Sequence, residues 1–119
     1  MLGRLLRNLA APRPDDPDPA RRLRALERLR SEDPEDAATL ERAARRDPDP
    51  QVREAAVARI NAPATLLDLA LDETLAHAAR GRLETVADPQ TLQGLVAGTA
   101  DAARLRVLLD VCADDTLRE

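Results

Sequence analysis

The sequence predicts an all-α fold, a string of about seven or eight short helices with no sheet. Apolar residues recur three and four positions apart rather than at alternate positions. The dipeptide Asp-Pro occurs six times, and an N-cap aspartate followed by proline at the first helical position is typical of helix starts. No segment is rich in the β-branched and aromatic residues that favour strands.

Each element is placed by this period and by these helix starts. Helices are predicted over residues 2–10, 19–30, 34–46, 50–60, 63–71, 73–86, 89–97 and 100–113. The starts at 19, 34, 50 and 89 each fall on the proline of an Asp-Pro pair. The preceding aspartate would accept hydrogen bonds from unpaired N–H groups and complement the positive end of the helix.

An internal repeat organises the first half of the chain. Residues 16–29 read DPDPARRLRALERL, and residues 47–60 read DPDPQVREAAVARI, with seven of fourteen positions identical. Short loops make consecutive helices antiparallel neighbours, and helix pairs that repeat along a chain form an α-solenoid. The sequence therefore predicts an α-solenoid of short antiparallel helix pairs.

The repeated unit resembles a HEAT-like repeat of the short bacterial kind. The resemblance rests on the Asp-Pro turn, the arginine, the small residues and the closing aliphatic: Asp47, Pro48, Val52, Arg53, Ala55, Ala56 and Ile60, matched in the first unit by Asp16, Pro17, Arg22, Ala25 and Leu29. It implies a ladder that links turn to helix through Asp16 with Arg22 and Asp47 with Arg53. The later units depart from this pattern, because Ala76 stands where the arginine would be and no aspartate lies six residues before Arg104 or Arg106.

The chain divides into an amphipathic N-terminal helix at 1–10, a Pro-rich extended linker at 11–17 and a HEAT-like repeat domain at 18–119. The opening Met-Leu-x-Arg-Leu-Leu, the Pro-rich gap and the Asp-Pro units together resemble the N-terminal region of large bacterial proteins. Those proteins carry coiled-coil domains of unknown function downstream. The resemblance implies that this chain is the leading part of a longer bacterial protein.

Composition argues against enzymatic chemistry. The 119 residues include one serine, one histidine and one cysteine, which leaves almost no room for a nucleophilic triad or a zinc site. We expect no enzyme activity, no cofactor and no metal. A single cysteine forms no internal disulfide, and no apolar run is long enough to cross a membrane, so the expected location is cytoplasmic.

Protein binding is the expected function, with nucleic-acid binding as the alternative. The candidate partner-binding residues are a leucine stripe on the first helix, which would otherwise cap the repeat stack, and four arginines: Leu2, Leu5, Leu6, Leu9, Arg22, Arg24, Arg53 and Arg59. All 18 basic residues are arginine, and they concentrate in the first half. Arginine suits phosphate, but the net charge of −4 and the absence of aromatic residues oppose nucleic-acid binding.

Overall fold

The computed structural model describes residues 13–118, and side chains up to residue 113. Over these residues the chain is all-helical, as predicted, with seven α-helices and no strand. The helices are α2 (Pro19–Glu27), α3 (Pro34–Arg46), α4 (Pro50–Val57), α5 (Pro63–Leu69), α6 (Ala76–Val86), α7 (Pro89–Gly98) and α8 (Ala102–Arg118). The predicted helix 2–10, with its leucine stripe, lies outside the described residues.

Capping explains most of the helix starts. Asp18, Asp33, Asp49 and Asp88 are N-caps whose carboxylates accept backbone hydrogen bonds from the first turn. A proline follows each of them at the first helical position, where its missing N–H leaves no bond unmade.

Several helix boundaries differ from the prediction. Helices α2 and α4 end at Glu27 and Val57, before the predicted residues 30 and 60, where the following N–H groups bond to carbonyls three residues back rather than four. Helix α6 begins at Ala76, later than the predicted residue 73, because Asp72 holds the Thr74 N–H in a turn at 2.9 Å. Helix α8 continues beyond residue 113, since no glycine or proline follows to stop it.

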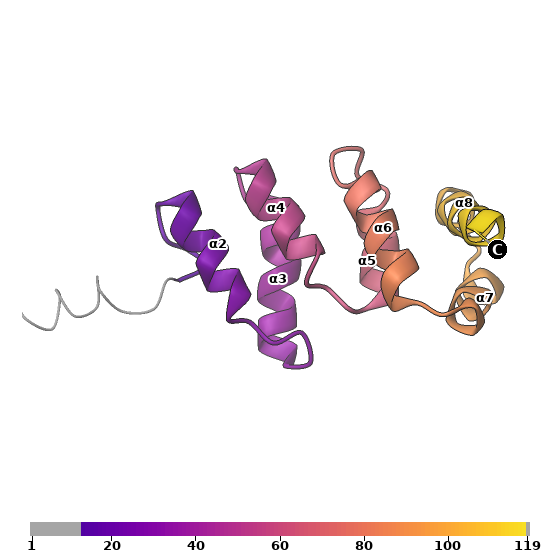
Figure 1. Ribbon diagram of the computed structural model, residues 1–119, viewed down its shortest axis with the longest axis horizontal. Helices are drawn as coiled ribbons and strands as arrows, with labels where there is room; N and C mark the ends of the chain where they lie inside the picture. The colour runs from indigo at the N-terminus through magenta and orange to yellow at the C-terminus, as the bar shows by residue number, and fades with distance from the viewer. Residues whose placement is uncertain (1–12, 119) are drawn as a thin grey trace, which may run out of the picture.

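The helices follow one another along the long axis of a molecule measuring 58 × 28 × 25 Å (Figure 1). Contacts join them in consecutive pairs: α3 with α4, α5 with α6, and α7 with α8. Helix α2 contacts α4, and each pair contacts the next mainly through its second helix, α4 with α6 and α6 with α8. In Figure 1 α7 and α8 are seen end-on whereas α2 to α6 run lengthwise, so the last pair is turned relative to the others.

Among the described residues, the buried core consists of leucine, valine, isoleucine and alanine, and Cys112 packs partly buried against it. Fully buried alanines, among them Ala44, Ala56 and Ala79, lie where helices pack. Small side chains at a helix contact let the two axes approach closely, which offsets the absence of aromatic residues. No helix of the described part is long and apolar enough to cross a membrane.

The Pro-rich segment is described from residue 13, where it makes a turn rather than the expected extended linker. The Asp16 N–H bonds the Arg13 carbonyl at 3.0 Å. Arg22 holds the segment from α2, donating to the carbonyls of Asp16 and Pro17 at 2.9 and 3.1 Å. These bonds fix the segment against the first described helix.

Truncation of Leu83, which is fully buried in α6, tests the core. We expect Leu83→Ala to lower the free energy of unfolding by about 2–5 kcal/mol, because the site loses apolar burial and gains a cavity. Urea unfolding measures this loss. The matched control is Leu109→Ala, at a leucine that is 59% exposed, which we expect to change stability by less than about 0.5 kcal/mol.

Acid should weaken the helix caps. The Thr91 backbone N–H, bound at 2.7 Å, is the main cause that holds the pKa of Asp88 below its usual value. A lowered folded-state pKa gives stability that is present above the unfolded value of about 3.9 and is lost as pH falls through the folded value. We expect Asp88→Asn, which keeps an accepting oxygen, to flatten this acid dependence in urea unfolding. An unchanged acid slope would show that this cap does not contribute.

Candidate functional site

An ion pair between Arg22 and Asp47 joins the first described unit to the second. The guanidinium donates twice to the carboxylate, from Nε to Oδ2 at 2.9 Å and from NH2 to Oδ1 at 3.2 Å. Both side chains are largely buried, at 11% and 6% exposed. The hydrogen bond to Asp47 is the main cause that raises the pKa of Arg22, so the Arg22 guanidinium stays charged.

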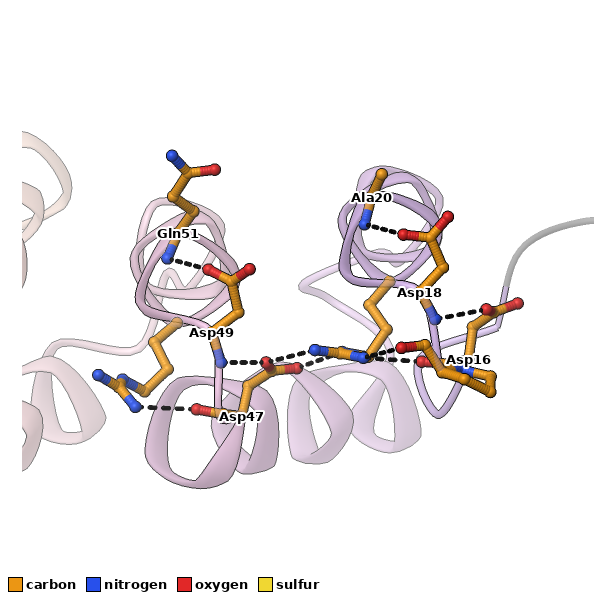
Figure 2. A network of polar contacts seen from close by, with 9 residues as sticks. Asp16, Asp18, Ala20, Asp47, Asp49 and Gln51 are labelled. Atoms are coloured by element: carbon orange, nitrogen blue, oxygen red, sulfur yellow. Dashed lines mark hydrogen bonds and ion pairs between the residues drawn. The ribbon is translucent and has the colours of Figure 1, made fainter.

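The two Asp-Pro turns have the same local geometry (Figure 2). Asp16 accepts the Asp18 N–H at 3.0 Å, and Asp47 accepts the Asp49 N–H at 2.9 Å. Asp18 and Asp49 in turn cap their helices, each accepting the N–H two residues ahead. The sequence repeat is therefore a repeat of hydrogen bonds.

The arginine six residues after each turn aspartate binds that aspartate's carbonyl, not its carboxylate. Arg22 reaches the Asp16 carbonyl at 2.9 Å, and Arg53 reaches the Asp47 carbonyl at the same distance. The predicted ladder contacts, Asp16 with Arg22 and Asp47 with Arg53, are thus hydrogen bonds to main-chain oxygens. The Asp16 carboxylate instead pairs with Arg21 at 2.7 Å.

Among the described residues, no ion pair equivalent to that of Arg22 with Asp47 joins Arg53 to the following turn. Arg53 stands where Arg22 does, but its Nε is buried with no partner among the described atoms. Asp72 lies in the turn before α6 and accepts hydrogen bonds from the backbone N–H and the hydroxyl of Thr74. Thr74 is the main cause that lowers the pKa of Asp72, and attraction to Arg53 and Arg45 adds to it.

A second row of arginines joins the units at the opposite ends of the second helices. Arg59 donates to the carbonyls of Glu27 and Leu29 at 3.1 and 2.9 Å, at the end of α2. Arg82 donates to the Ile60 carbonyl at 3.0 Å, after the end of α4, and to the Asn61 side chain. Each arginine therefore binds carbonyls at or just after the C-terminal end of an earlier helix, where backbone oxygens have no partner within the helix.

Two ion pairs hold α8 against the preceding pair. Arg104 binds Asp68 of α5 at 2.7 Å, and Arg80 of α6 lies 3.6 Å from Asp110. The contacts of Arg82, Arg104 and Asp68 were not predicted from the sequence. For Arg82 a signal existed, because it lies, like Arg59, three residues after a buried alanine and directly before a buried aliphatic residue. The spacing from Arg59 to Arg82 is, however, shorter than that from Arg28 to Arg59 in the sequence repeat.

Of the four arginines predicted to bind a partner, three are engaged within the chain. Arg22, Arg53 and Arg59 make the contacts above, whereas Arg24 is exposed and pairs with no described residue. His77 is exposed and Cys112 half-buried. Among the described residues, no group of three histidine, cysteine or acidic side chains is placed to hold a metal ion.

Replacing Arg22 tests the first bridge. We expect Arg22→Gln to shift the urea midpoint to lower concentration, because the substitution leaves the buried Asp47 carboxylate without its counter-ion. Arg24→Gln, on the same helix, is the matched control and should leave the midpoint unchanged. Equal midpoints for the two variants would show that the bridge contributes nothing to stability.

No model of a known protein family matches the chain, and no curated protein or solved structure matches it.

Proposed function

We propose that the chain is a HEAT-like α-solenoid module that binds protein partners and has no enzymatic activity. The observation that carries this proposal is a set of arginines on successive helices, each of which hydrogen-bonds to a neighbouring unit. Arg22 and Arg59 join the first described unit to the second, and Arg82 joins the second to the third. Stacked units of this kind present an extended surface.

The surface proposed for the partner is the exposed side of α2, α4 and α6. It carries Arg24 and Arg28 on α2 and at its C-cap, Glu54 on α4, and His77 and Gly81 on α6. No atom lies within 4 Å of where a Cβ would stand on Gly81. A partner backbone can therefore approach α6 closely, with charged contacts on the neighbouring helices to fix its position.

Two features of the composition bear on the organism and the cellular location of this module. A single cysteine fits a reducing compartment, and the exclusive use of arginine over lysine fits a GC-rich bacterial genome. We propose the bacterial cytoplasm on these grounds.

Nucleic-acid binding is the second candidate. Arg24, Arg28, Arg42 and Arg46 are exposed and pair with no described residue, which suits phosphate contacts. The net charge of −4 and the lack of any aromatic side chain for base stacking oppose it.

A photo-crosslinking amino acid at position 58, exposed at the end of α4, tests the proposed surface in cells. We expect a discrete protein adduct that survives nuclease treatment. The control position is 64, exposed on α5, where we expect no such adduct. Equal labelling at both positions, or an adduct lost on nuclease treatment, would contradict protein binding by this surface.

A further inference from the structure

A cleft of about 380 Å³ opens between the turn that precedes α2 and the C-terminal half of α3. Three prolines, Pro14, Pro17 and Pro48, form part of its wall. Proline has no N–H, so these residues offer apolar surface without backbone donors. The donors of the cleft are arginine side chains, and their pairing decides what it can bind.

The acidic side chains in the cleft are partly neutralised from within the chain. The Asp16 carboxylate pairs with Arg21 and that of Asp47 pairs with Arg22. Four of the five N–H donors of Arg22 are already used, by the Asp47 carboxylate and by the carbonyls of Asp16 and Pro17. Asp15 is exposed on the turn, and no described residue pairs with its carboxylate.

Arg42 and Arg46 line the same cleft, and both are exposed. They lie four residues apart on α3, so they share a helix face, where two like charges repel. No described residue pairs with either guanidinium. Their neighbour Arg45 is different, because it binds Glu41 at 3.1 Å. Within the described part of the chain, two cations without an ion-pair partner thus border the prolines, and the one unpaired carboxylate of the cleft is that of Asp15.

We propose that this cleft binds an acidic peptide segment of a partner protein. Aspartate or glutamate side chains of the segment pair with Arg42 and Arg46, and its apolar atoms lie against the prolines. The planar guanidinium matches a carboxylate through two parallel hydrogen bonds. A nucleic acid fits this site less well, because two arginines contact few phosphates and no aromatic side chain stacks on a base.

The site is separate from the surface of α2, α4 and α6 proposed above, and the two share no residue. Each stands if the other fails. Loss of binding on changing Arg42 and Arg46 concerns the cleft, whereas loss on changing Arg24 and Arg28 concerns the helix surface.

The test is fluorescence anisotropy of a labelled oligoglutamate peptide, with oligoglutamine as the uncharged control peptide. We expect saturable binding of oligoglutamate alone, weakened about tenfold or more in the double variant Arg42→Gln/Arg46→Gln. The matched double variant Arg24→Gln/Arg28→Gln removes the same charge from α2 and its C-cap and should bind as the unmodified protein does. Circular dichroism checks that both variants remain helical.

Three results would overturn the proposal: no saturable binding, equal loss in the two double variants, or equally tight binding of an oligothymidylate. If Arg42→Gln/Arg46→Gln does not fold, amide chemical shifts of the unmodified protein decide instead. Oligoglutamate should then shift the amides of Thr39 and Ala43, which line the cleft. Shifts confined to other parts of the chain would contradict the site.

Discussion

The structure depends on Asp47 as the point where two units meet. Its carboxylate accepts Arg22 of the preceding unit and the Asp49 N–H of its own turn, while its carbonyl accepts Arg53. Asp47 is 8% exposed and is the one buried charged residue in the described chain. A buried carboxylate is stable only when it is paired and hydrogen-bonded, so the position of the first Asp-Pro turn relative to the second is tightly constrained.

The arginine rows matter because the core is built from small side chains. Leucine and alanine contacts fill space but specify direction weakly, since apolar contacts are not directional. Carbonyls just after α2 and α4 accept hydrogen bonds from Arg59 and Arg82 of the following unit. These bonds fix the position of neighbouring units at the ends of the helices opposite the Asp-Pro turns. Polar bridges thus set the geometry, and apolar burial supplies the favourable energy.

Helix type and most helix starts were predictable from the sequence, because Asp-Pro caps act locally. Ladder partners were less predictable. The spacing from Asp16 to Arg22 pointed to a contact within one turn, yet the carboxylate that Arg22 binds is that of Asp47, in the next turn. Such a contact depends on how units stack, which local spacing does not encode. The pairing of Arg104 with Asp68 was unpredictable for the same reason, since the last helix pair is turned relative to the others.

A double-mutant cycle on Arg22 and Asp47 tests the central claim most directly. Arg22→Gln, Asp47→Asn and the double variant would be compared by urea unfolding; asparagine keeps an oxygen for the Asp49 N–H. The account predicts strong coupling, with the double variant losing far less stability than the two single losses added together. Additive losses would show that the two side chains act independently and that the units are not joined by this bridge.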